Sequence, residues 1–212
     1  MIHLAHYDAL TELTSRGLFQ SKVNRAVVRL REHGERFNIL LLDLDHFKAI
    51  NDSLGPLAGD RLLRQVAARL RSCVHRDDVV ARLGGDEFAV LQVVNGDPRA
   101  CAIALADRLL DIIGEPYDLD GHRAIVETSI GIVLAPEHGA EAEQLIKSAD
   151  LALYQAKAEG RNAWRMFEDA MAEQARARYE LELDLRNAIE HREFELFYQP
   201  VVDTATCEVR GL

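Results

Sequence analysis

The sequence predicts an α/β fold with a mixed central sheet. Stretches in which apolar residues recur at helical spacing alternate with short apolar runs of strand length, which is the order expected of an α/β domain. Two of these runs are separated only by a turn around Gly84 and Gly85, which predicts a hairpin and hence an antiparallel pair. Together these features describe a ferredoxin-like βαββαβ core in a chain of 212 residues, long enough for one domain and an appendage.

The first half of the chain is expected to hold three helices around one buried strand. Apolar residues at helical spacing predict a helix over residues 17–33, which Gly34 ends. The nearly unbroken apolar run at 37–42 predicts a strand buried on both faces. A second helix is expected at 57–73. A third is expected at 97–114, where an Asp-Pro pair supplies the N-cap and the first-turn proline and a glycine ends the helix.

The rest of the core continues the alternation. A strand is expected at 124–134, with a short strand near Tyr117 before it. Helical spacing of apolar residues predicts a helix at 141–158, and a last short strand is expected at 163–167.

The sequence divides the chain into three predicted segments. Residues 1–168 form the α/β domain. Residues 169–191 are charged and helix-favouring, which is typical of a connector helix. Strands are expected at 194–203 and 207–212, and a bare hairpin is only marginally stable. Residues 192–212 are therefore expected to be the incomplete start of a second domain.

Composition excludes several classes of function. The formal net charge of −10 argues against general binding to DNA or RNA, which needs a basic surface. The three cysteines, Cys73, Cys101 and Cys207, are widely spaced and lack zinc-site spacing, which favours reduced thiols. No apolar run approaches the ~18 residues of a membrane span, and no signal peptide is visible. We therefore expect this segment to be cytoplasmic, and an upstream membrane or sensor segment stays open.

The hairpin tip is the first candidate site. Glycine leaves the backbone bare, so that another group can approach it closely, and Asp86 and Glu87 follow the glycine pair at once. Adjacent carboxylates repel each other, and a bare, doubly acidic tip suits a divalent cation that carries phosphates. The alternative is an ordinary Gly-Gly turn with solvated acids.

Two further acids follow the buried strand at 37–42. Asp43 lies at its carboxyl end, where ligands of open α/β sheets bind, and Asp45 shares the same face because it is two residues away. Asp43 and Asp86 together offer the hard oxygen ligands that Mg²⁺ or Mn²⁺ on a nucleotide needs. Either acid alone is also consistent with a solvated strand end. His46 has no partner at ligand spacing, and we assign it no role.

Polar residues elsewhere suit a nucleotide. The amide of Asn51 and the carboxylate of Asp60 can recognise guanine, whose N1–H and 2-amino donors adenine lacks. The alternative for this pair is a turn residue and a helix cap. Lys157 and Arg161 are four residues apart near a helix end, where they can face one way or simply favour the helix dipole. Lys48 is also consistent with a surface lysine on a short helix.

Five separated motifs, in order, resemble those of GGDEF domains, the diguanylate cyclases, which join two GTP molecules into cyclic di-GMP. The first motif departs from the family pattern DxLTGLxNR at Glu12 and Ser15, and the third departs from NDxxGHxxGD at Pro56. The matching segments are DALTELTSR at 8–16, LDLDHFK at 42–48, NDSLGPLAGD at 51–60, RLGGDEF at 82–88 and YQAKAEGRN at 154–162.

The resemblance implies a nucleotidyl-cyclase-like fold and a metal-dependent reaction. By that match, Asp43 and the backbone carbonyl of Leu44 hold the metal. Asp86 binds metal and takes a proton, and Glu87 is an accessory acid. Lys48 stabilises charge on the phosphates in the transition state.

The resemblance also implies how GTP binds. Asn51 and Asp60 would bind guanine, and Lys157 and Arg161 would grip the terminal phosphates. The bare backbone at residues 84–85 would lie against the substrate. Because one site holds one nucleotide, the reaction would need a homodimer.

Two rival functions stay open. The domain could be a catalytically weak, GTP-binding regulatory module, since residues 185–212 resemble the opening of EAL domains, the cyclic di-GMP phosphodiesterases. The Glu-Ala-Leu signature itself is absent, so no phosphodiesterase activity is expected in this piece. Alternatively, the chain could be a scaffold that dimerises through its connector helix and ignores nucleotide.

A regulatory site of many family members is altered here. The RxxD product-inhibition motif is HRDD at residues 75–78, with His75 in place of arginine and Asp78 retained. Histidine lacks the bidentate fork of guanidinium, and Arg76 is one position off. Weak or no product inhibition is therefore expected.

Overall fold

The computed structural model describes residues 6–206 and 208–211. The chain divides into two compact units, residues 1–172 and 173–212. Cys207, the third cysteine, lies outside the described residues. Cys73 and Cys101 are free, and burial raises the pKa of the Cys73 thiol. No helix of the described residues has the length and apolar character needed to cross a membrane.

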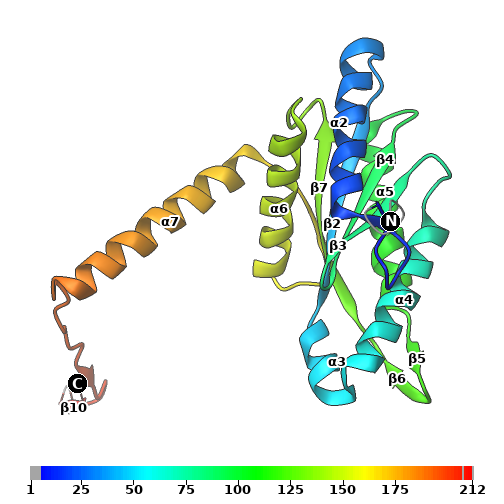
Figure 1. The fold of residues 1–212 in the computed structure, drawn as a ribbon. Coiled ribbons are helices and arrows are strands. Elements are labelled where there is room, and N and C mark those ends of the chain that lie inside the picture. Colours follow the sequence, from blue (N-terminus) through cyan, green and yellow to red (C-terminus); the bar gives the residue numbers. More distant parts are fainter. Residues whose placement is uncertain (1–5, 207, 212) are drawn as a thin grey trace. The chain divides into compact units, whose positions relative to one another are not determined.

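A six-stranded mixed sheet is the centre of the first unit (Figure 1). Its outer neighbours β1–β3 and β7–β8 are parallel, and the inner pairs are antiparallel. The predicted α/β fold with a mixed sheet is therefore confirmed. The strands, in their order across the sheet, are β1 (Thr14–Ser15), β3 (Val79–Gly84), β4 (Glu87–Val93), β2 (Phe37–Asp45), β7 (Glu127–Ala135) and β8 (Trp164–Met166).

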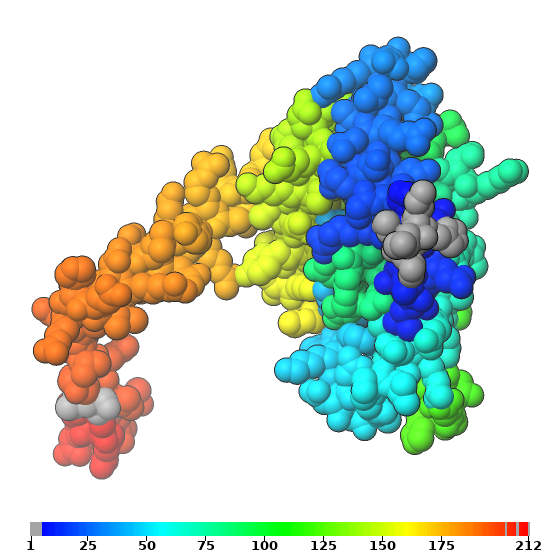
Figure 2. Space-filling model, in the orientation of Figure 1, coloured from blue at the N-terminus to red at the C-terminus, as the bar shows by residue number. Residues whose placement is uncertain are grey.

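Helices cover both faces of this sheet. Residues of α2 (Arg16–His33) and α6 (Ala142–Ala158) share one apolar cluster, and these helices lie side by side (Figure 2). Residues of α4 (Pro56–Cys73) and α5 (Pro98–Gly114) belong to the other cluster. All four helices lie within two residues of their predicted bounds, which shows that periodicity carried enough information to find them.

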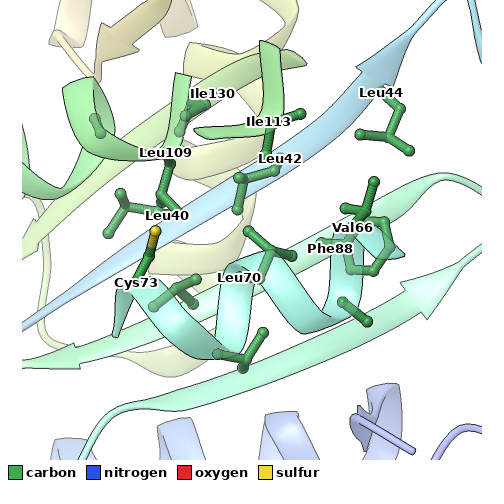
Figure 3. Packing of buried hydrophobic residues seen from close by; sticks show 14 of the residues in the cluster. Leu40, Leu42, Leu44, Val66, Leu70, Cys73, Phe88, Leu109, Ile113 and Ile130 are labelled. Atoms are coloured by element: carbon green, nitrogen blue, oxygen red, sulfur yellow. The ribbon is translucent and has the colours of Figure 1, made fainter. Parts of the chain in front are cut away.

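The strand β2 runs between the two clusters. Its alternate residues Leu40, Leu42 and Leu44 pack with α4 and α5, as Figure 3 shows, while Ile39 and Leu41 face α2 and α6. All five side chains are buried, which confirms the prediction of a strand covered on both faces. This burial fixes the place where the strand ends and its acidic residues begin.

Two parts of the core differ from the sequence-based expectation. The strand predicted at 124–134 is confirmed as β7 (Glu127–Ala135), but it begins three residues later than expected, because Ala124 ends β6 (His122–Ala124), which pairs with β5 (Tyr117–Leu119) in a separate small sheet. The turn between them is closed by Gly121 N, which donates to the Asp118 carboxylate at 2.7 Å. The helix α3 (Phe47–Leu54) was predicted only as a short helix around Lys48.

The second unit contains little regular structure beyond its helix. The helix α7 (Asp169–Glu190) confirms the helical prediction, and its apolar residues Leu181, Leu185 and Ile189 are exposed. The strand predicted at 194–203 is wrong over most of its length, because only β9 (Val201–Val202) pairs, with β10 (Val209–Gly211). Within the described residues of this unit the run at 194–200 has no neighbouring strand, and backbone groups that lack a ladder partner do not form a strand.

The departure from the family pattern at Glu12 has a structural cost. Glu12 has φ +56°, in the left-handed region that favours glycine, and its backbone oxygen accepts from Arg71. Glu12→Gly is expected to raise the free energy of unfolding by about 0.5–1 kcal/mol, since relief of this strain exceeds the entropy that glycine adds to the unfolded chain. Urea unfolding measures it, and Glu12→Ala is the control that keeps the strain. Equal stability of the two variants would contradict the prediction.

Candidate active site

The hairpin tip lies against the end of β2. In the ladder between β2 and β4, Asp43 is opposite Glu87, and Leu44 N donates to the backbone oxygen of Asp86 at 3.3 Å. Gly84 and Gly85 have φ of +146° and +50°, which only glycine adopts readily in succession. The hairpin therefore brings Asp86 to the strand end that carries Asp43.

The electrostatics of this edge favour a cation. Burial raises the pKa of the Asp43 carboxyl, and the negative charge of Asp86 raises it further, while Lys157 opposes both effects. Lys157 Nζ lies 2.7 Å from Asp43 Oδ2. A positive charge beside Asp43 thus offsets the repulsion between two carboxylates that the fold forces together.

Two arginines hold the tip in place. Arg82 donates from Nε and Nη2 to the Gly85 oxygen (3.0 and 2.7 Å) and from Nη1 to the Asp8 carboxylate (3.1 and 3.3 Å). Arg16 donates from Nε to the Leu83 oxygen at 2.9 Å, and its Nη2 pairs with Glu87 Oε2 at 3.0 Å. Arginine forks that bridge backbone oxygens and carboxylates restrict the tip geometrically.

The helices α3 and α4 place the residues predicted to bind guanine. A Cβ atom at Gly59 would lie 1.9 Å from Asn51 Oδ1, so the Asn51 side chain rests on the bare backbone directly before Asp60. Pro56 occupies the first turn of α4, where its missing N–H has no partner to lose. Pro56 therefore replaces the usual histidine without breaking the helix.

Lys48 lies in the first turn of α3. Its side chain is exposed and makes no hydrogen bond or ion pair with any residue that the structure describes. Lys48 follows Asp45 by three residues in the chain, and its exposed ammonium has no partner among the described residues that a ligand would have to displace.

The end of α6 completes the site. Lys157 lies in the last turn of α6, and Arg161 N donates back to the Ala156 oxygen at 3.1 Å, which closes the helix in a Schellman-type turn. Arg161 Nε lies 3.9 Å from Asp45 Oδ1. Asp43 and Asp45 therefore both face the end of α6, as their spacing along the strand predicts.

The residues at this edge fit a divalent cation that arrives with phosphates. Asp43 and Asp86 supply hard carboxylate oxygens with the Leu44 backbone between them. Among the described residues, no group of three or more His, Cys, Asp or Glu side chains is arranged to hold a metal. Mg²⁺ characteristically binds through one or two carboxylates and completes its shell with phosphate and water.

Comparison with known proteins gives a consistent picture. The family model described as diguanylate cyclase, GGDEF domain, matches residues 5–163. Among curated proteins, the bifunctional diguanylate cyclase/cyclic di-GMP phosphodiesterase MucR of Pseudomonas aeruginosa is 41% identical over 202 residues, and the cyclic di-GMP phosphodiesterase NbdA of the same organism is 41% identical over 209 residues. These alignments cover 95% and 99% of this chain, and 29% and 26% of the relatives. The chain thus spans little more than a quarter of their length.

A solved structure shares the fold. The GGDEF domain of TpbB from Pseudomonas aeruginosa superposes with a TM-score of 0.78 at 39% identity, over 81% of this chain and 99% of that one. The family match covers all five motif segments and every strand of the central sheet except β8. The chain therefore belongs to the GGDEF family of diguanylate cyclase domains.

Proposed function

We propose that this domain is a diguanylate cyclase, which condenses two GTP molecules into cyclic di-GMP and two pyrophosphates with Mg²⁺ or Mn²⁺. The observation that carries the proposal is the contact between the tip and the strand end, where burial and then the charge of Asp86 raise the pKa of Asp43 and Lys157 supplies a cation. Such an edge binds a metal–phosphate group better than it binds solvent.

GTP is held at its two ends. Asn51 and Asp60 recognise guanine from the contact between α3 and α4. Lys157 pairs with Asp43 in this structure, and with metal and GTP bound, Lys157 and Arg161 would hold the terminal phosphates. The bare backbone at residues 84–85 lets the substrate approach the tip.

Each chain contributes half of the reaction. In a homodimer, the 3′-oxygen of one GTP attacks the α-phosphorus of the other, the bond to the β-phosphate breaks, and pyrophosphate leaves with that electron pair. Asp86 accepts the hydroxyl proton, and Glu87 is an accessory acid held by Arg16. Lys48 stabilises the growing negative charge. Asp43, the Leu44 carbonyl and Asp86 would hold the divalent cation, which would supply further charge stabilisation.

The neighbouring segments fit a longer signalling protein. We assign residues 1–168 to the cyclase domain, 169–191 to a connector helix and 192–212 to the start of an EAL domain, in a cytoplasmic segment. A second candidate is a GTP-binding domain that regulates an attached phosphodiesterase. The similarity to NbdA, which is named a phosphodiesterase, favours it.

One experiment separates these functions. The protein is incubated at high concentration with GTP and Mg²⁺, and the products are identified by mass. Cyclic di-GMP with pyrophosphate is the expected result. Tight GTP binding without turnover, even in forced dimers, would favour the regulatory role, and absence of GTP binding by calorimetry would overturn both.

Added cyclic di-GMP is expected to inhibit only weakly through residues 75–78. The Asp78 carboxylate accepts from His75 N at 2.8 Å and from Val93 N at 2.9 Å, so its oxygens are already engaged by backbone. The His75 imidazole lacks the bidentate fork of arginine. Initial rates with and without product measure the effect, and His75→Arg is the contrast expected to gain inhibition. Strong inhibition of the parent that Asp78→Ala removes would contradict the prediction.

A further inference from the structure

Asp45 is a buried carboxylate beside the site that the proposed reaction leaves without a role. Its residue is 4% exposed, at the last position of β2. Three donors converge on it. Ser129 Oγ donates at 2.9 and 3.0 Å, Asn162 N donates at 3.1 Å, and Arg161 Nε lies 3.9 Å away. A carboxylate suits this place because both of its oxygens only accept.

The loop that Asp45 contacts has an unusual backbone. Arg161 and Asn162 have φ of +64° and +45°, directly after Gly160 at +123°. Left-handed conformations are costly for residues other than glycine, and they persist only where the surroundings fix them. Here Arg161 N is tied to the Ala156 oxygen and Asn162 N to Asp45. The loop is thus anchored on both sides of Arg161.

Asp45 differs from its neighbour Asp43 in what it can bind. The Asp45 side chain is 1% exposed, whereas that of Asp43 is 14% exposed. The Asp45 oxygens already accept from Ser129 and Asn162, while Asp43 pairs with the Lys157 ammonium. Asp45 is therefore placed to shape the protein and Asp43 to meet a ligand.

We propose that Asp45 is a positioning residue that orients the Arg161 guanidinium toward the terminal phosphate and so sets the preference for GTP over GDP. This inference rests on the proposed function. A guanidinium in a fixed orientation loses less entropy when it binds phosphate, and a free loop would spend part of that binding energy on ordering. Loss of Asp45 should therefore weaken binding of the triphosphate and leave guanine recognition unchanged.

Calorimetry with 3′-deoxy-GTP, which lacks the attacking hydroxyl, and with GDP, both with Mg²⁺, tests the proposal. The parent should bind the triphosphate more tightly. In Asp45→Asn one carboxylate oxygen becomes an NH₂ group, which cannot accept from the surrounding donors. The affinity for the triphosphate relative to GDP should therefore fall roughly tenfold, which corresponds to the loss of one charged hydrogen bond. Ser129→Ala removes only one hydroxyl donor to Asp45 and should disturb folding less. It should lower the affinity ratio of triphosphate to GDP by a smaller factor.

A double-mutant cycle separates positioning from general damage. Arg161→Ala should lower the ratio as Asp45→Asn does, and the double variant should lower it no further, because both act through one guanidinium. Asp107→Asn is the matched control, because the Asp107 carboxylate accepts from Trp164 Nε1 at 2.7 Å and Trp164 begins β8 just after the loop at 160–162. In this variant the affinity ratio should not change. Additive losses, or an unchanged ratio in both Asp45→Asn and Ser129→Ala, would overturn the inference alone. A parent that binds neither nucleotide would overturn the proposed function with it.

Discussion

Asp86→Asn is expected to lower the rate of cyclic di-GMP formation by roughly a thousandfold or more, since it removes a metal ligand and the proton acceptor together. The fold should survive, because the tip is held through main-chain oxygens of Leu83, Gly85 and Asp86. Loss of the negative charge that raises the pKa of Asp43 should leave stability unchanged or slightly higher. Initial rates by chromatography and urea unfolding measure the two effects.

Glu87→Gln is the matched control for this variant. Glu87 is the adjacent acid, but its carboxylate is half exposed and pairs with Arg16 at 3.0 Å. An exposed ion pair contributes little to stability, and an accessory acid should cost far less activity than Asp86. If Asp86→Asn forms cyclic di-GMP at the rate of the parent protein, or if the two variants lose the same activity, Asp86 has no specific role in the reaction.

The fold could be predicted wherever burial repeats along the chain. The helices α2, α4, α5 and α6 each present an apolar stripe to one face of the sheet, and the period of that stripe is visible in the sequence. The helix α3 spans only eight residues and packs on the core through the partly buried Phe47 and Ile50, so its apolar stripe is too short to mark a helix in the sequence. Ala124 belongs to β6 because the chain turns between β5 and β6, where Gly121 N donates to the Asp118 carboxylate, and an apolar count over 124–134 does not detect that turn.

The site divides in the same way. The proximity of Asp43 and Asp86 could be predicted, because acids at the end of a buried strand and at a glycine tip conflict with their local structure. Arg16 and Arg82 were missed as supports of the tip, since their partners are backbone oxygens at the hairpin and acids distant in sequence. The sequence signal for this role is that Arg16 ends the first matched motif and Arg82 begins the fourth.

Gly59→Ala is expected to lower the affinity for GTP roughly a hundredfold while changing stability little, because the added methyl group displaces one side chain. The new Cβ would lie 1.9 Å from Asn51 Oδ1, a distance that real Cβ atoms essentially never show, and 3.2 Å from Phe47 Cζ, which is a tight contact. The Asn51 amide is the end of a flexible side chain on α3, so it can swing away at modest cost. Guanine would then lose the amide that we propose binds it.

A cycle with Asn51→Ala decides whether this is the cause. Asn51→Ala should reduce GTP affinity as strongly as Gly59→Ala, and the double variant should lose nothing further, since the methyl group then has room and no amide remains to displace. Gly17→Ala is the control, because a Cβ there meets nothing within 4 Å and alanine is favoured in α2 by up to about 1 kcal/mol. Parent affinity in Gly59→Ala, or additive losses in the double variant, would show that Gly59 does not act through Asn51.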